Sequence, residues 1–171
     1  NDMKRYDVQG ELVTIKSSTG LHLDGILYER AANKKTIIHA HGSYGNFYQN
    51  HFLRMMAKRF LSSGINLFSF NLAGHDGFGE GYRNKEDFEY VGGAVQHFEQ
   101  CVSDIEGAIS FVREFSDQIL LQGHSLGCDR VLHYLVTKES DLDFILLSPC
   151  DSYQLQRNWI HPETVEDQIA R

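Results

Sequence analysis

The first part of the chain alternates hydrophobic and polar residues with the period of a β-strand. The alternation runs through Glu11–Ser17 and again through Leu21–Glu29. Between these stretches, Ser18–Gly20 has the residue types of a turn. The pattern therefore predicts a β-hairpin.

Four later stretches are short and almost continuously apolar. They are Thr36–Ala40, Ile65–Phe70, Ile119–Leu121 and Phe144–Leu147. Runs of this kind are typical of parallel strands that are covered on both faces.

Three segments between these runs carry apolar residues at helical spacing. They are His51–Leu61, His97–Phe115 and Leu126–Val136. A hairpin followed by alternating strands and helices predicts one α/β domain over residues 1–171, with a mostly parallel sheet. No strand pattern follows Leu147, although Pro162–Ala170 has the beginning of a helical one. We therefore expect the domain to be cut before its last strands.

The segment Gly123–Gly127 reads Gly-His-Ser-Leu-Gly and stands between a predicted buried strand and a predicted helix. This is the setting of a nucleophile elbow, in which a sharp turn exposes a serine at the start of a helix. The helix N-terminus favours negative charge beside that serine, here Ser125. The alternative interpretation is an ordinary turn whose serine caps the helix.

A second motif, His41–Asn46, follows the apolar run Thr36–Ala40 and precedes a predicted helix. A histidine–glycine loop at this place can supply a backbone N–H to a developing oxyanion. We predict that the N–H groups of Ser43 and Leu126 form an oxyanion hole. The alternative is a plain glycine-rich turn.

At these residues the sequence resembles the serine α/β-hydrolase family, which includes esterases, lipases and thioesterases. Gly123–Gly127 resembles the family's elbow, His41-Gly42 its oxyanion loop, and Asn71–Gly77 the loop after the following strand. The resemblance extends from the hairpin to Leu147 and implies an α/β-hydrolase fold. It also implies that an ester or thioester is cleaved through an acyl-enzyme on Ser125, without a cofactor.

The catalytic acid and base of this family follow the nucleophile along the chain. Asp151 and His161 have that order, but they are close together and no predicted strand separates them. We therefore expect both partners beyond Arg171. Residues 1–171 alone should then be nearly inactive. They should also associate through the open sheet edge, with a second copy or with the remaining C-terminal part.

Composition narrows the range of partners. The formal net charge is −7, whereas nucleic-acid binding needs clustered Lys and Arg. Cys101, Cys128 and Cys150 form no C-x-x-C pair, which favours a reducing, cytoplasmic setting without structural zinc. No apolar run approaches the length of a membrane span. A small-molecule ester or thioester is the expected partner, with no nucleic acid and no membrane.

Histidines recur at the ends of the predicted strands. They are His39, His41, His75 and His124. Imidazoles gathered at one sheet edge can bind zinc, but no Asp or Glu stands beside them at a ligand-like spacing. We therefore predict no metal site.

The stretch Gly74–Gly81 is rich in glycine but lacks the Gly-Lys-Ser/Thr of a phosphate loop. We expect it to form a mobile loop near the rim of the active site. Phe78 in this stretch, with Tyr82 and Phe88 after it, either lines an acyl pocket or packs against those two residues. The segment Glu80–Gly93 is either an excursion over the site or a long loop.

Two other functions remain open. An acyltransferase that moves acyl groups between thiols uses a similar elbow, although the His41-Gly42 loop favours the hydrolase. A hydrolase-like domain without a triad would serve only for binding, and the missing acid and base favour that alternative.

Overall fold

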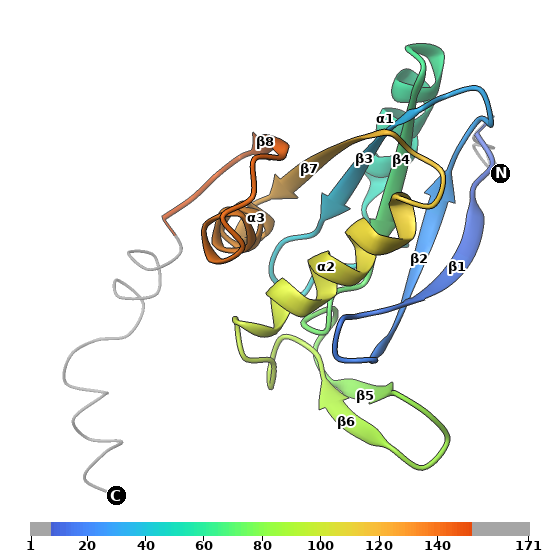
Figure 1. Ribbon diagram of the computed structural model, residues 1–171. Coiled ribbons are helices and arrows are strands. Elements are labelled where there is room, and N and C mark those ends of the chain that lie inside the picture. Colours follow the sequence, from blue (N-terminus) through green and yellow to red (C-terminus); the bar gives the residue numbers. More distant parts are fainter. Residues whose placement is uncertain (1–7, 152–171) are drawn as a thin grey trace, which may run out of the picture.

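The computed structural model of the chain describes residues 8–151. Its centre is a six-stranded sheet in the order β1-β2-β4-β3-β7-β8 (Figure 1). The strands are β1 (Glu11–Lys16), β2 (His22–Tyr28), β3 (Lys35–Ala40), β4 (Ile65–Phe70), β7 (Gln118–His124) and β8 (Asp143–Leu147). Strands β4, β3, β7 and β8 are parallel, and β1 and β2 form the antiparallel hairpin. The predicted hairpin and mostly parallel sheet are confirmed.

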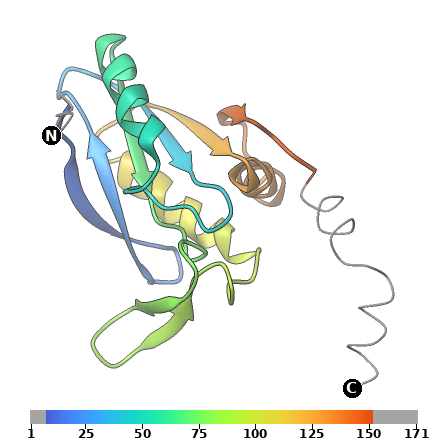
Figure 2. The ribbon, with the colours of Figure 1, turned by 180° about the vertical axis from the view of Figure 1, so that it is seen from behind.

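Three helices cover the two faces of this sheet (Figures 1 and 2). They are α1 (His51–Ser62), α2 (Gln100–Val112) and α3 (Leu126–Thr137). Helix α1 packs on one face, where its Leu53 meets Ile37 of β3. Helices α2 and α3 pack on the other face, against Ile38 and Phe68. Adjacent residues of β3 are therefore buried on opposite faces, which explains why its sequence is apolar without alternation.

Helix α2 is shorter than the helical spacing predicts. The apolar pattern indicates a helix over His97–Phe115, whereas the helix occupies Gln100–Val112. At its start, the side-chain oxygen of Gln100 accepts a hydrogen bond from the His97 N–H, which closes a turn instead of a helical residue. No helix between residues 8 and 151 has the length and apolar character needed to cross a membrane.

Strands β5 (Gly79–Tyr82) and β6 (Phe88–Val91) form a separate antiparallel hairpin, which projects from the sheet at the bottom of Figure 1. One face packs on the domain, since a Cβ atom at Gly81 would lie 2.9 Å from Leu21. The opposite face exposes aromatic rings that contact one another. The segment Glu80–Gly93 is thus an ordered hairpin, and its aromatic residues pack against one another.

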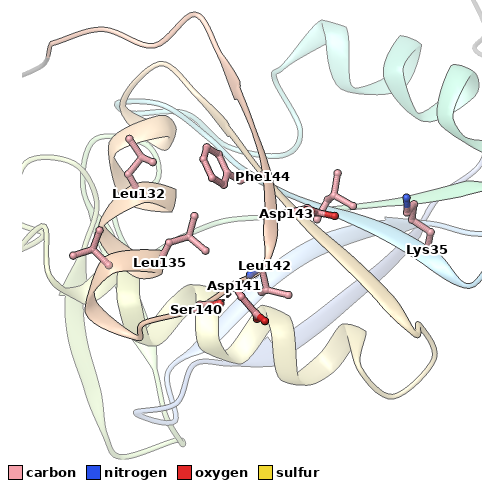
Figure 3. A pocket seen from close by; sticks show the side chains of 10 residues that line it. Lys35, Leu132, Leu135, Ser140, Asp141, Leu142, Asp143 and Phe144 are labelled. Carbon is pink, nitrogen blue, oxygen red and sulfur yellow. Dashed lines mark hydrogen bonds between the residues drawn. The ribbon is translucent and has the colours of Figure 1, made fainter.

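The sheet edge at β8 exposes apolar surface. Phe144 of β8 is 49% exposed and Val136 of α3 is 77% exposed. A hollow of about 750 Å³ lies between this strand and this helix, with Leu132, Leu135 and Phe144 among its lining residues (Figure 3). The predicted association of the chain depends on this surface and stays a prediction.

Candidate active site

Ser125 occupies the turn between β7, which ends at His124, and α3, which begins at Leu126. Its backbone has φ 53° and ψ −126°, a combination that L-residues rarely adopt. The Ser125 N–H donates a hydrogen bond of 3.0 Å to the carbonyl oxygen of Leu147, at the end of β8. Strained backbone of this kind costs about 1–3 kcal/mol and is typical of functional sites.

Two glycines allow the strand and the helix to cross closely at this turn. A Cβ atom at Gly123 would lie 2.3 Å from the carbonyl oxygen of Gly127. A Cβ atom at Gly127 would lie 2.2 Å from the carbonyl oxygen of Ala40 in β3. Because both obstacles are backbone atoms, neither position has room for a side chain. The spacing of the two glycines in the motif therefore follows from the crossing of β7, β3 and α3.

The loop after β3 lies directly against Ser125. A Cβ atom at Gly42 would be 3.0 Å from the Cβ atom of Ser125 and 3.4 Å from its Oγ atom. The chain turns back immediately, with a hydrogen bond of 3.1 Å from the Gly45 N–H to the Gly42 carbonyl oxygen. The sequence motifs His41–Asn46 and Gly123–Gly127, far apart along the chain, thus meet at one place.

The backbone N–H groups of Ser43 and Leu126 have no hydrogen-bond partner within the part of the chain that the structure describes. Leu126 is the first residue of α3, so its N–H belongs to the unpaired donors of the helix N-terminus. Two unpaired N–H groups on the loops that flank Ser125 can hold a negatively charged oxygen.

No hydrogen bond joins the Ser125 side chain to an acid or base among residues 8–151. Asp151 is exposed and lies a few residues after β8, whereas His161 is outside the described residues. The predicted location of the acid and the base beyond Arg171 therefore stays a prediction.

The histidines at the strand ends contact neighbouring side chains. His39 contacts Gln122 at 3.0 Å, and His75 pairs with Asp76 at 2.9 Å. The rings of His39 and His124 both pack edge-on against Phe52. Within residues 8–151, no group of three His, Cys, Asp or Glu side chains is placed to hold a metal ion.

Two buried charged residues behind the His41 loop were missed at the sequence level. Arg130 of α3 and Asp104 of α2 are both almost fully buried. Asp104 accepts a hydrogen bond of 2.8 Å from the N–H of Ala73, which lies in the loop after β4. In the sequence, Asp104 stands at helical spacing between Cys101 and Ala108, which lie on the buried face of α2. This spacing could have indicated that the carboxyl group of Asp104 is buried.

Several solved structures resemble this arrangement, although no protein-family model and no curated protein matches the sequence. The α/β hydrolase GrgF from Penicillium sp. sh18 matches with a TM-score of 0.65 and 18% identity, over 83% of this chain and 46% of GrgF. The chain has the α/β-hydrolase fold. Esterase Pf2001 of Pyrococcus furiosus shares it with a TM-score of 0.64 and 19% identity, over 84% of this chain and 52% of the esterase.

A third similar structure is that of Est1E from Butyrivibrio proteoclasticus, which has been solved with ferulic acid bound. It matches with a TM-score of 0.61 and 18% identity, over 80% of this chain and 53% of Est1E. The chain thus spans about half the length of these three proteins.

Buried charge in this α/β-hydrolase fold makes stability depend on pH. Burial is the largest cause that raises the pKa of Asp104 from 3.8 to about 7, against the opposing effects of the Ala73 N–H and the Arg130 charge. Between pH 3.8 and about pH 7, Asp104 holds a proton in the folded protein that it releases in the unfolded chain. Stability therefore falls as the pH rises across this range.

We expect Asp104→Asn to gain stability relative to the unmodified protein as the pH rises from 4 to 7, by at most about 1.4 kcal/mol for each pH unit. The asparagine oxygen can still accept the hydrogen bond from Ala73. Urea unfolding at a series of pH values measures the difference. A difference that stays constant over this range would contradict the prediction.

Two buried histidines change the stability with pH in the opposite direction. Comparing Asp104→Asn with the unmodified protein removes their contribution. Burial lowers the pKa of His39 and His41 from 6.5 to about 3. The unfolded chain therefore binds protons below pH 6.5 that the folded protein does not, so stability is lost as the pH falls below that value. Both proteins contain these histidines, and their contribution cancels in the difference.

Proposed function

We propose that the chain contains the nucleophile and oxyanion hole of a serine hydrolase that cleaves a carboxylic ester or thioester. Oγ of Ser125 attacks the carbonyl carbon, and its proton passes to a base. The N–H groups of Leu126 and Ser43 hold the resulting oxyanion. When the intermediate collapses, the leaving alcohol or thiol takes the proton and the acyl group remains on Ser125. Water then releases the acid.

One observation supports this proposal above the others: Ser125 sits in a strained turn with Gly42 against its Oγ atom. An ordinary helix cap needs neither positive φ nor a second loop at its hydroxyl group. Moreover, the side chain of Ser125 makes no capping hydrogen bond to α3. The helix N-terminus behind it supplies the positive end of the helix dipole, which stabilises a developing negative charge.

The proposal needs a base and an orienting carboxylate from outside residues 8–151. It assigns these roles to a histidine and to an Asp or Glu later in the protein, in the order that serine hydrolases of this fold use. The name of Pf2001, an esterase, supports an ester substrate for a protein with this fold.

The test is labelling with a fluorophosphonate, which reacts covalently with an activated serine. In the full-length protein we expect one equivalent of probe on the tryptic peptide that contains Ser125. A panel of p-nitrophenyl esters and acyl thioesters then measures release of the acid, with and without an added thiol acceptor. Labelling of the Ser125 peptide together with hydrolysis would support the proposal. The absence of labelling would contradict it, and faster release with the acceptor would identify an acyltransferase.

A further inference from the structure

A buried arginine holds the loop that carries the proposed oxyanion donor. Arg130 of α3 is only 3% exposed. Its Nη1 atom donates hydrogen bonds to the carbonyl oxygen of His41 at 3.0 Å and to that of Gly42 at 3.4 Å. Its Nη2 atom donates to the side-chain oxygen of Gln96 at 3.1 Å. The guanidinium group therefore connects α3 to two successive peptide groups of the loop.

His41 holds the same carbonyl group from another side. The Leu72 N–H donates to Nε2 of His41 at 3.1 Å, so the ring proton must be on Nδ1. Nδ1 then donates to the Gly42 carbonyl oxygen at 2.8 Å. Burial keeps this ring neutral, since it lowers the pKa of His41 to about 3. Because Nδ1 and Arg130 both carry protons there, their contact is not a hydrogen bond, and each binds the carbonyl oxygen instead.

The direction of the Gly42 carbonyl fixes the direction of the next N–H. Gly42 C=O and Ser43 N–H belong to one planar trans peptide group, in which they point in opposite directions. The carbonyl points toward Arg130 and His41 in the interior, whereas a Cβ atom at Gly42 would lie against Ser125. The Ser43 N–H therefore points away from Arg130 and His41, and the Ser125 hydroxyl lies close to the same loop.

We infer that Arg130 is a positioning residue, which sets the Ser43 N–H for oxyanion binding by holding the Gly42–Ser43 peptide group. It does not touch the substrate. Burying a guanidinium group carries a desolvation penalty of several kcal/mol, and two backbone carbonyls with Gln96 offset it here. An apolar residue on this face of α3 would avoid that penalty but would leave the peptide group held by His41 and the turn alone. This inference rests on the proposed function.

Two substitutions at Arg130 test the inference. Arg130→Met removes both hydrogen bonds to the loop, and Arg130→Lys keeps a cation that can reach one carbonyl. With a p-nitrophenyl ester we expect Arg130→Met to lower kcat per titrated active site by about 100-fold, as loss of an oxyanion donor does, with KM within about threefold. Arg130→Lys should give an intermediate kcat. Inhibition by a trifluoromethyl ketone, which binds as a tetrahedral oxyanion, should weaken in parallel.

A matched control separates positioning from stability. Tyr134 lies one turn further along the buried face of α3. Tyr134→Leu should lower the melting temperature but leave kcat per titrated site unchanged. If Arg130→Met also left kcat and ketone inhibition unchanged, the inference would be wrong.

A milder variant covers the case in which Arg130→Met does not fold. Gln96 is half-buried and holds only the far end of the guanidinium group. Gln96→Ala should lower kcat by several-fold at unchanged KM, and no change in kcat would contradict the inference. Failure of the proposed function gives a different result, because the unmodified protein would then show no fluorophosphonate label on Ser125.

Discussion

Ser125→Ala is expected to abolish ester hydrolysis, with kcat lower by about 10⁴-fold or more. Alanine has no atom that can form the acyl-enzyme, so any remaining rate comes from the oxyanion hole and substrate binding alone. Fluorophosphonate labelling of the full-length protein should also disappear. The measurement is p-nitrophenyl ester hydrolysis at saturating substrate, with the variant checked for native circular dichroism.

The control for this substitution is Ser110→Ala, on the exposed side of α2. Among the described residues, its hydroxyl group donates only to the carbonyl oxygen of Glu106, one turn earlier. Activity should therefore equal that of the unmodified protein. Retention of more than a tenth of the activity in Ser125→Ala would refute Ser125 as the nucleophile. Loss of activity in both variants would point to a general effect of the substitutions.

Gly127→Ala is expected to destabilise the fold by about 3–5 kcal/mol, at the upper end of single-residue effects. The added Cβ atom would lie 2.2 Å from the Ala40 carbonyl oxygen and 2.8 Å from that of His41. Both are backbone atoms at the end of β3, so the clash can be relieved only by moving α3 away from the sheet. Urea unfolding, followed by circular dichroism, measures the loss.

Gly77→Ala is the matched control, because the same methyl group is added in open space. No atom lies within 4 Å of a Cβ atom at Gly77, and its φ is not positive. Its stability should stay within about 0.5 kcal/mol of the unmodified protein. Equal unfolding curves for the two variants would show that the close crossing at Gly127 is not needed for the fold.

The strands of the sheet were predictable from the sequence where burial alone determines which positions are hydrophobic. The apolar run Thr36–Ala40 is continuous because neighbours on both faces of β3 are helices, and that burial leaves a direct mark on the sequence. The strand order was not predictable, because it depends on which runs pair, and the runs look alike. The hairpin of β5 and β6 was missed because Gly79 and Gly81 are turn-forming residues, and their strand conformation depends on packing against the domain.

In the candidate site, too, the local motif was predictable from the sequence, whereas the contacts between distant segments were not. Gly123–Gly127 is one contiguous segment, so its strand–turn–helix setting could be predicted from local pattern. The approach of Gly42 to Ser125 joins residues far apart in sequence and needed coordinates. Arg130 was missed altogether, since an arginine in a helix is usually a surface residue and only the structure shows which carbonyls it meets.

The hydrogen bond from the Ser125 N–H to the Leu147 carbonyl oxygen has a kinetic consequence. Strand β8 is at the edge of the described sheet, and edge strands open locally more often than the strands beside them. Each opening of β8 would release the amide of Ser125 while β7 and α3 remain in place. Hydrogen–deuterium exchange at this one amide would therefore follow the lifetime of β8, although its residue lies in the turn after β7. Any contact that stabilises β8 would therefore also stabilise the backbone of Ser125, which carries the proposed nucleophile.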